Sequence, residues 1–442
     1  MSFNQTPMMS NQSLKFFELR TLVLPTLFGI EAVTRSELLQ LGFAPEQITL
    51  QDGLVRLTLS EGDDLSTNIA LLNYSLRSCE RVLVELASAD ITNFDQLFDF
   101  TASLPWEDVL DPGYFLEVTG YSRKSQLFGV PAMQRLIKKA IISRLMEHSP
   151  EKETYTIEGR WSENDDLGTD RLQFAMVDDR LTFALDTSGE GLHKRGYRRL
   201  THSAPIRETL AAAILSLAHF PQNTLSRGEL LWDPVCGVGS FIIEAALILS
   251  DTAPGLKRHF SAEKMKICGK AIFDRVREQL KQKSLLYYQE RDPQKQKRLT
   301  ELRGLLWGSD ISAEYIAQAE KNAHYAGVSE LVNFRQGDII KMSEQKYFPD
   351  ASLETAERIL LVANPPYAER LGTAEEMKRI HRAIADICFY YDGQINLKTP
   401  FRVSVITADK YFEKAIVRRA DKRRKLYNGM IECTLFQYFK HS

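Results

Sequence analysis

The chain lacks the features that mark secreted, membrane-spanning or metal-binding proteins. Its five cysteines include no Cys-x-x-Cys pair, which argues against a disulfide framework or a zinc ribbon and for a reducing compartment. No uninterrupted apolar stretch reaches membrane-spanning length. Residues 1–13 are polar and lack the charged-then-apolar order of a signal peptide. We therefore expect a cytoplasmic protein without membrane or metal partners, which begins with a disordered leader over residues 1–15.

The chain also lacks an excess of charge of either sign. It contains 56 Lys and Arg against 58 Asp and Glu, for a formal net charge of -2. The whole-chain balance therefore gives no indication of a polyanionic partner, and any such case must rest on local patches. A hydrophobic content of 44% is ordinary for a globular protein, and 442 residues exceed a single core. We expect two or three domains.

The hydrophobic pattern changes near the middle of the chain. Over residues 16–188, short strands and helices alternate as in a small α+β module, including a hairpin around Asp178-Asp179-Arg180. Residues 189–203 are rich in glycine and basic residues and predict a linker. From Pro205 onward, strands alternate with helices, which predicts an α/β fold with a doubly wound, mostly parallel sheet. Asn428-Gly429 between two apolar runs predicts an antiparallel pair at the end of that sheet.

An insertion interrupts the α/β pattern at residues 257–303. Its second half, residues 281–303, is highly charged. We interpret this half as a solvated helix rather than as an RNA-binding arm, because charge runs of this kind usually form exposed faces.

The first strand of the α/β region ends in a glycine-containing loop, Asp233-Pro-Val-Cys-Gly237-Val-Gly239-Ser240. Glycines let the backbone approach a ligand closely, and the amides at a helix start favour an anionic group. A dinucleotide is disfavoured, because Ile242 occupies the third position of Gly-x-Gly-x-x-Gly. An amino-acid-like ligand fits better, since Asp233 and loop carbonyls can hold its ammonium while loop amides meet its carboxylate.

Two later strands also end in carboxylates, namely Asp310, followed by Ile311, and Asp338, followed by Ile339. Asp310 is the expected acceptor for ribose hydroxyls, and Asp338 can accept from an adenine amine. Each acid alone also fits a helix N-cap. Together they place three acidic strand ends on one edge of the sheet, where open α/β folds bind ligands. The combination predicts S-adenosylmethionine (SAM) as the cofactor.

A further apolar strand stops at Asn364-Pro365-Pro366-Tyr367. Two prolines forbid continuation as sheet or helix, so this corner presents one amide, one carbonyl and one aromatic ring. That set fits a flat substrate with an exocyclic amine, because the oxygens accept from the amine and the ring stacks on the base. Read alone, the tetrapeptide also fits a turn that caps a strand.

With these motifs the chain resembles the THUMP-domain RNA (guanine-N2) methyltransferases, above all their large-subunit ribosomal RNA group. The resemblance rests on Gly-Leu-His-Lys-Arg-Gly-Tyr-Arg within residues 185–214, on Asp-Pro-Val-Cys-Gly-Val-Gly-Ser, and on Asn-Pro-Pro-Tyr-Ala-Glu-Arg-Leu. It covers nearly the whole chain beyond the leader. The family usually has Ser-Gly-Thr at Val238-Gly239-Ser240 and Gly at Ala368, and both departures are small.

The resemblance implies a Rossmann-like class I methyltransferase domain behind an α+β ferredoxin-like and THUMP region. The implied domains are a ferredoxin-like part over residues 16–63, a THUMP RNA-binding domain over 64–188, a basic linker over 189–204 and a methyltransferase domain over 205–442. The implied activity is transfer of a methyl group from SAM to the exocyclic N2 of a guanine, in large-subunit ribosomal RNA. A transfer RNA enzyme of the same architecture and a non-catalytic RNA-binding or assembly factor remain the alternatives.

The resemblance also implies roles for individual residues. Asn364 and the Pro365 carbonyl would accept from the guanine amine, and Tyr367 would stack on the base beside Pro366. Asp233, Gly237 and Gly239 would line the methionine end of the cofactor, Asp310 its ribose and Asp338 its adenine. The helix start at residues 205–208 would cover its other side. The full expected cofactor set is Pro205, Glu208, Thr209, Asp233, Pro234, Cys236, Gly237, Gly239, Ser240, Asp310, Ile311, Asp338, Ile339 and Asn364.

Three clusters of basic residues are candidates for RNA contact. The first comprises Arg123, Lys124, Arg135, Lys138, Lys139 and Arg144, and the second comprises Lys194, Arg195, Arg198 and Arg199. The third spans residues 418–425. Any one of them is more often a solvated face, but three on a near-neutral chain suggest a segregated basic surface. We expect RNA as the partner of a monomer or weak dimer.

Overall fold

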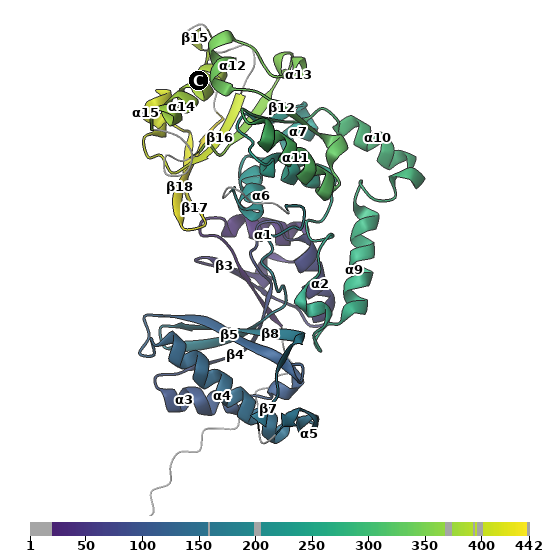
Figure 1. Ribbon diagram of the computed structural model, residues 1–442, viewed down its shortest axis with the longest axis vertical. Coiled ribbons are helices and arrows are strands. Elements are labelled where there is room, and N and C mark those ends of the chain that lie inside the picture. Colours follow the sequence, from purple (N-terminus) through teal and green to yellow (C-terminus); the bar gives the residue numbers. More distant parts are fainter. Residues whose placement is uncertain are drawn as a thin grey trace, which may run out of the picture. The chain divides into compact units, whose positions relative to one another are not determined.

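The structure is a computed structural model (Figure 1). It describes residues 20–157, 160–198, 205–366, 374–391, 394–395 and 401–439. The chain divides into two compact units. The first is built from Leu83–Asp186 with Met265–Ile267 and the start of the chain, and the second from Val23–Val82, Thr187–Lys264 and Cys268–Ser442. Compactness therefore groups residues 23–82 with the α/β region, and the domain boundaries expected from sequence stay predictions.

The first unit contains four neighbouring strands of one sheet, in the order β4-β9-β8-β5, and two packed helices. Strands β4 and β9 pair antiparallel, β8 and β9 form a hairpin, and β5 joins β8 in parallel. The hairpin turns at Asp178 and Asp179, which both have positive φ, so the hairpin predicted at this position is confirmed. Its elements are β4 (Leu83–Asp90), α3 (Phe94–Ser103), β5 (Tyr114–Arg123), α4 (Val130–His148), α5 (Lys152–Tyr155), β6 (Thr156–Ile157), β7 (Arg160–Trp161), β8 (Asn164–Val177) and β9 (Arg180–Asp186).

The second unit begins with a small α+β segment. Strands β2 and β3 form an antiparallel hairpin, and helix α1 contacts both. Asp64 caps helix α2 by accepting from the backbone N–H of Thr67. The elements are β1 (Thr21–Pro25), which starts in the first unit, α1 (Glu31–Gln40), β2 (Ile48–Gln51), β3 (Leu54–Thr58) and α2 (Leu65–Ser75).

The rest of the second unit is a seven-stranded sheet in the order β12-β11-β10-β13-β16-β18-β17. The first five strands in this order run parallel, and β18 and β17 are antiparallel to their neighbours. The predicted doubly wound sheet and its antiparallel terminal pair are confirmed. The strands are β10 (Leu230–Asp233), β11 (Leu306–Asp310), β12 (Val332–Gln336), β13 (Ile359–Ala363), β16 (Phe401–Thr407), β17 (Lys422–Asn428) and β18 (Ile431–Tyr438). A separate pair is formed by β14 (Tyr390–Tyr391) and β15 (Gln394–Ile395).

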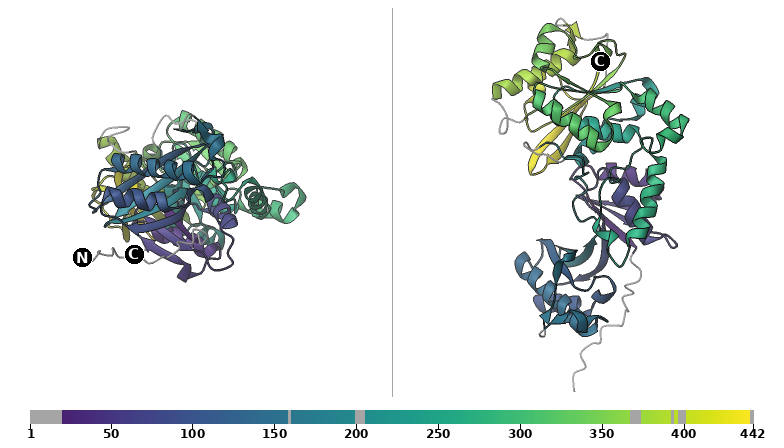
Figure 2. Two further views of the ribbon diagram at one scale, coloured as in Figure 1. Left: turned by 90° about the horizontal axis from the view of Figure 1, so that it is seen from below. Right: turned by 45° about the vertical axis from the view of Figure 1, so that its right-hand side comes forward.

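Helices cover both faces of this sheet (Figures 1 and 2). Alternate residues of β13 point to opposite sides, so Leu360 and Val362 join one apolar core while Leu361 and Ala363 join the other. The first core is completed by α6 (Glu208–Leu217), α8 (Ser240–Leu249) and α11 (Ala313–Ala326), and the second by α12 (Ile339–Gln345), α14 (Ala374–Cys388) and α15 (Phe412–Ile416). Strands buried on both faces read as continuous apolar runs, which is why the sequence pattern was clear here. Two short helices, α7 (Gln222–Arg227) and α13 (Ala351–Glu354), also belong to this part.

The charged half of the insertion is not the single helix that we predicted. Helix α9 (Lys270–Lys283) ends at Ser284, and α10 (Pro293–Leu302) begins after a break. Asp292 accepts from the N–H groups of Gln294 and Lys295 and so caps α10, while Pro293 occupies its first turn. A cap followed by proline starts a new helix. None of the helices in the described part of the chain is long and apolar enough to cross a membrane.

One buried histidine makes the stability of the sheet domain depend on pH. His381 on α14 is fully buried, its ring meets Phe412 edge-on at 4.8 Å, and its Nδ1 lies 3.4 Å from a carboxylate oxygen of Asp409. Burial lowers the pKa of His381 from 6.5 to about 4, although Asp409 acts in the opposite direction. The unfolded chain therefore takes up a proton that the folded chain excludes.

We expect stability to fall as pH drops from about 6.5 toward 4, by on the order of 3 kcal/mol from this group. His381→Leu should remove this component, so that its melting temperature falls less than that of the wild type between neutral pH and pH 5. His219→Asn at an exposed site with φ +55° is the matched control. Parallel pH profiles for the wild type and the His381 variant would refute the assignment.

Candidate active site

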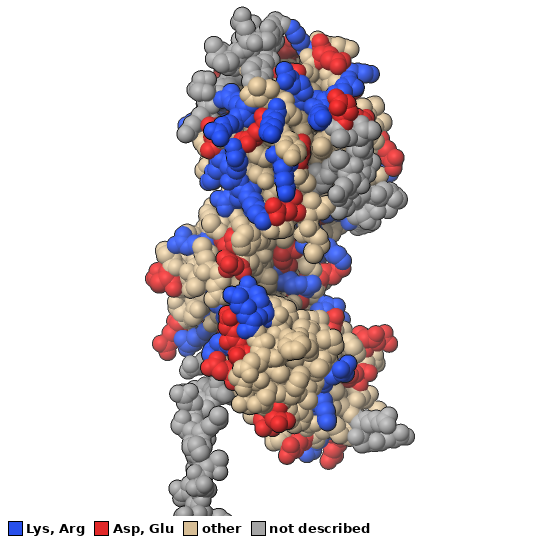
Figure 3. Space-filling view, turned by 90° about the vertical axis from the view of Figure 1, so that its left-hand side faces the viewer, with Lys and Arg blue, Asp and Glu red and all other residues tan. Residues whose placement is uncertain are grey.

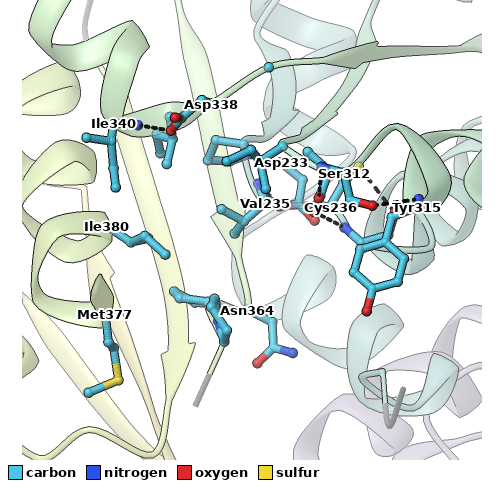
Figure 4. A pocket seen from close by; sticks show the side chains of 18 of the residues that line it. Asp233, Val235, Cys236, Ser312, Tyr315, Asp338, Ile340, Asn364, Met377 and Ile380 are labelled. Carbon is cyan, nitrogen blue, oxygen red and sulfur yellow. Dashed lines mark hydrogen bonds between the residues drawn. The ribbon is translucent and has the colours of Figure 1, made fainter. Parts of the chain in front are cut away.

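The candidate site lies where the order of the parallel strands reverses direction. Strand β10 pairs in parallel with β11 on one side and β13 on the other, so their carboxyl ends share one edge of the sheet. A cavity of 1080 Å³ opens there (Figure 4). Single-ligand pockets hold roughly 300–1,000 Å³, so this one has room for a cofactor together with part of a second ligand. Of the residues expected from sequence, the cavity is lined by Pro205, Asp233, Pro234, Cys236, Gly237, Ser240, Asp310, Ile311, Asp338, Ile339, Asn364, Pro365 and Pro366.

The loop after β10 is held in a fixed shape by hydrogen bonds from neighbouring elements. The N–H of Cys236 donates to the carbonyl of Ser309 (2.9 Å), and Asn322 Nδ2 donates to the carbonyl of Val238 (3.1 Å). Gly237 has φ +52°, and its N–H donates to Asp310 Oδ2 (2.9 Å). The loop therefore turns around the end of β11 and presents backbone at the cavity wall, as close approach to a ligand requires.

Asp233 and Asp310 place two buried carboxylates beside this loop. Asp233 is 2% exposed and accepts from the N–H of Val235, while Asp310 is 8% exposed and accepts from the N–H groups of Gly237 and Ser312. Burial raises the pKa of both carboxyls, and the charge of Asp310 raises the pKa of Asp233 further. Two carboxylates in such a place are costly without a cation or hydroxyl donors. This end of the cavity therefore favours a ligand that brings an ammonium and hydroxyl groups.

The remaining predicted groups occupy the other walls of the cavity. Asp338 lies at the start of α12, where its carboxylate accepts from the N–H of Ile340 (2.9 Å), so it is an N-cap as well as a wall residue. Asn364 follows β13 directly, is half-buried, and extends its amide into the space below Asp233 in Figure 4. Pro365 is buried beside it. Tyr367 lies outside the described residues, so its predicted stacking role stays a prediction.

Several lining residues were missed from the sequence. Tyr315 lies in the first turn of α11, five residues after Asp310, so the helix that follows an acidic strand end was the signal that could have found it. Met377 and Ile380 lie three residues apart on α14 and form an apolar wall (Figure 4). No local signal identifies that pair, because its place depends on how α14 packs against α12.

Three residues predicted to touch the cofactor do not line the cavity. Gly239, with φ +84°, faces the interior: a Cβ there would lie 2.9 Å from Phe334 and 3.0 Å from Ala319. Its role is close packing of α8 rather than ligand contact. Glu208 accepts from Arg198 Nη2 (2.6 Å), and the hydroxyl of Thr209 donates to Glu80. The polar atoms of these two side chains are directed to protein partners, which corrects the expectation for both.

The second basic cluster is largely structural. Arg195 is 3% exposed and donates to the carbonyls of Leu192 and Arg77. Its guanidinium also lies 3.6 Å from Glu244, which is fully buried. Arg198 pairs with buried Glu208, and exposed Lys194 pairs with Glu190 at 2.7 Å. The burial of Arg195 is incompatible with the phosphate contact predicted for it, because buried arginines are retained by their partners. Arg199 lies outside the described residues.

The first basic cluster is partly available at the surface. Arg123, Lys124 and Lys139 are exposed. Lys138 instead lies over the ring of Phe115 at 4.3 Å and pairs with Glu163 at 2.8 Å. Arg135 is exposed as well, whereas Arg144 pairs with Glu107. The prediction of RNA contact therefore stays open for the four exposed residues, and Lys138 and Arg144 have structural partners.

Comparisons with known proteins agree with this geometry. Residues 195–437 match the model described as "RMKL-like, methyltransferase domain". The chain belongs to the RMKL-like methyltransferase family. Residues 21–83 match the RlmL ferredoxin-like domain, and residues 91–157 match the THUMP domain.

Two curated relatives and one solved structure cover most of this methyltransferase. YpsC of Bacillus subtilis (strain 168), whose name marks it as a proposed RNA methyltransferase, is 32% identical over 95% of this chain and 96% of its own length. "Ribosomal RNA large subunit methyltransferase K/L" of Syntrophotalea carbinolica is 30% identical over 93% of this chain, which spans only 52% of that protein. The crystal structure of SMU.472, described as a candidate methyltransferase and complexed with SAH, has a TM-score of 0.75 at 28% identity and covers 96% of this chain and 98% of its own. Together with the cavity, these matches support SAM as the cofactor of an RNA methyltransferase.

The two glycines of the loop should respond differently to the same substitution. Gly239→Ala combines positive φ with a Cβ that meets Phe334 and Ala319, so we expect a loss of stability of about 2–4 kcal/mol. At Gly237 a Cβ meets nothing within 4 Å and would enter the cavity, so Gly237→Ala should cost about 1 kcal/mol of stability but weaken SAM binding. Urea unfolding and titration calorimetry with SAM measure the two effects, and equal destabilisation by both changes would contradict this division.

Proposed function

We propose that this methyltransferase transfers a methyl group from SAM to the exocyclic N2 of a guanine in RNA, and that the RNA is the large-subunit ribosomal RNA. The observation that carries the proposal is the position of Asn364. It follows the strand next to β10 and lines the same cavity as Asp233 and Asp310. The residues proposed to bind the cofactor and the proposed acceptor for the amine therefore line one cavity.

The residues at the methionine and ribose end support SAM in particular. Asp233 and nearby loop carbonyls suit its ammonium, and Asp310 suits its ribose hydroxyls while holding the glycine loop. Asp338 and the apolar residues Ile339 and Ile340 suit an adenine ring. SAM supplies the electrophilic methyl group, and the residues described here position it and satisfy its polar groups.

The Asn-Pro-Pro corner would act on the amine nitrogen of the base. This nitrogen shares its lone pair with the ring, and acceptors placed at its hydrogens favour a pyramidal geometry in which the lone pair faces the methyl carbon. The Asn364 side-chain oxygen and the Pro365 carbonyl are the candidate acceptors. The new nitrogen–carbon bond would form as the carbon–sulfur bond of SAM breaks, which leaves S-adenosylhomocysteine, and the nitrogen would then release one proton to water. Positioning and electrostatics do most of this work without a strong base.

The nature of the substrate is proposed from the family. The THUMP match and the names of the relatives favour RNA over DNA, and the K/L relatives favour the large ribosomal subunit. This chain spans about half the length of those K/L relatives, so their full activity is not carried over. A base inside a duplex would have to be flipped out to reach Asn364.

Asn364→Ala should lower the rate of methyl transfer by at least about a hundredfold, because an acceptor at the reacting amine is lost. SAM affinity should remain nearly unchanged, since Asp233, Asp310 and the glycine loop are intact. Single-turnover transfer and calorimetry measure the two quantities. Asn333→Ala, at a residue of β12 that donates to the Leu306 carbonyl and does not line the cavity, is the matched control. Equal losses of SAM binding and transfer would remove the proposed division of roles.

The substrate itself is tested by transfer of tritium from labelled SAM to total RNA from a strain lacking this protein. The RNA is fractionated by size and digested to nucleosides. Label in N2-methylguanosine from the large ribosomal RNA is the expected result. Label in the transfer RNA fraction would favour a transfer RNA enzyme, and label in another nucleoside would overturn the N2 assignment. Absence of label despite SAM binding would favour a precursor particle as substrate or a non-catalytic role.

A further inference from the structure

Positive charge is concentrated in the C-terminal part of the second unit, although the whole chain has no excess of positive charge. Residues 410–432 include eight Lys or Arg and three Asp or Glu, whereas the whole chain has a net charge of -2. Figure 3 shows Lys and Arg side chains gathered on the face that carries α15 and β17. We call this set the β17 surface and define it by its exposed members Lys410, Lys414, Arg419, Lys422, Arg423 and Lys425.

Strand β17 is the edge strand of the seven-stranded sheet. The residue pairing across the sheet aligns part of β17 with the end of β13, where the Asn364-Pro365-Pro366 corner begins. Ala363, the residue before Asn364, is aligned with Arg423 of β17. The alignment runs across the two strands between them, through Val405 of β16 and Phe436 of β18. Neighbouring strands lie about 4.8 Å apart, so the backbone of β17 runs about 14 Å from that of β13. Both strands run in the same direction, and Lys425 lies two rows farther toward the carboxyl edge.

The charges on this strand are only partly compensated. Arg423 pairs with Glu413 (2.8 Å) and Lys425 pairs with Glu432 (2.7 Å). Those carboxylates hold the basic side chains in place at the surface, but three acidic residues cannot balance eight basic ones. Alternate residues of a strand share a face about 7 Å apart, which is comparable to the separation of neighbouring phosphates along one nucleic acid strand. An edge strand rich in Lys and Arg is also protected from pairing with a second sheet.

Exposed aromatic rings accompany the charges. Tyr411 is 65% exposed, immediately precedes α15, and its ring lies under the Lys414 ammonium at 5.0 Å. Phe28 is 47% exposed and meets Tyr427 edge-on at 6.3 Å beside the end of β17. Basic side chains interleaved with rings suit a ligand that has both phosphates and unpaired bases. An acidic protein surface would use the charges but not the rings.

We propose that the β17 surface is the docking site for the sugar-phosphate backbone of the RNA that flanks the target guanine. The inference rests on the proposed function for the identity of the substrate, and it adds where the substrate lies. Contacts along β17, whose backbone runs about 14 Å from that of β13, fix the register of the RNA strand while the target base leaves the stack and enters the cavity. These contacts are to phosphates, so they position the RNA and carry no sequence information.

The test is a double charge neutralisation in the full chain, Arg423→Gln with Lys425→Gln, at the two alternate residues that share one face of β17. Both side chains are exposed and neither lines the cavity. The matched control is Lys297→Gln with Arg298→Gln on α10, which changes the net charge equally at exposed positions of the same unit. The probe is protein-free large ribosomal RNA from a strain lacking this protein, and affinity is measured by filter binding over a range of KCl concentrations.

We expect the β17 double variant to bind this RNA at least about tenfold more weakly near 0.1 M KCl. The slope of log affinity against log salt should fall by about 2, because about one counterion is released for each phosphate contact. The control variant should match the wild type in both quantities. The KM for RNA should rise in the β17 variant while kcat at saturating RNA and SAM affinity stay close to wild type.

Three outcomes would overturn the proposal. Equal weakening by the control variant would show that only net charge matters. An unchanged salt slope in the β17 variant would show that no phosphates are contacted there, and RNA binding that is insensitive to the β17 change would leave an acidic protein as the better occupant. The proposed function fails separately, when the wild type binds RNA at this surface but methylates a nucleoside other than guanosine.

Discussion

The carboxylate of Asp310 is the interaction on which the site depends. One of its oxygens holds the N–H of Gly237 and the other holds the N–H of Ser312 at the start of α11. The loop after β10 and the helix after β11 are thereby fixed relative to each other before any ligand arrives. A shift in this carboxylate would move the loop backbone at the cavity wall and the helix that carries Tyr315. Preorganisation of this kind lowers the cost of ordering the site on binding.

The sequence predicted the sheet and its ligand edge well, because each strand there is buried on both faces and ends in a distinctive polar residue. Asp233, Asp310, Asp338 and Asn364 could be placed on one edge from strand order alone. Tertiary partners decided the rest. Gly239 turned out to serve packing because Phe334 and Ala319 fill the space that its missing side chain leaves, and neither neighbour is close in sequence. Met377 and Ile380 reach the cavity through the packing of α14, which no local pattern specifies.

Whether a cluster of basic residues is buried or exposed also could not be predicted from the local sequence. Residues 194–198 and 418–425 looked alike as charge clusters, yet they differ in burial. Arg195 and Arg198 face buried Glu244 and Glu208 and hold the segment after β9 against the sheet domain. The residues on β17 project from an edge strand, where Arg423 and Lys425 pair with the partly exposed carboxylates of Glu413 and Glu432. Burial of the counter-charge, rather than the number of basic residues, separates a structural cluster from a surface that is available to a polyanion.

The division of the chain has a consequence for how the protein is assembled. The unit that contains the THUMP match begins at Leu83 and ends at Asp186 apart from small additions, and these two residues are direct partners across β4 and β9. Its ends are therefore adjacent, as in a module inserted into a surface loop. The chain before and after it forms a single body with the ferredoxin-like segment. The residues on either side of it, Val82 and Thr187, are hydrogen-bonded to each other as well, so the module interrupts the sequence of the second unit without separating in space the two segments that flank it.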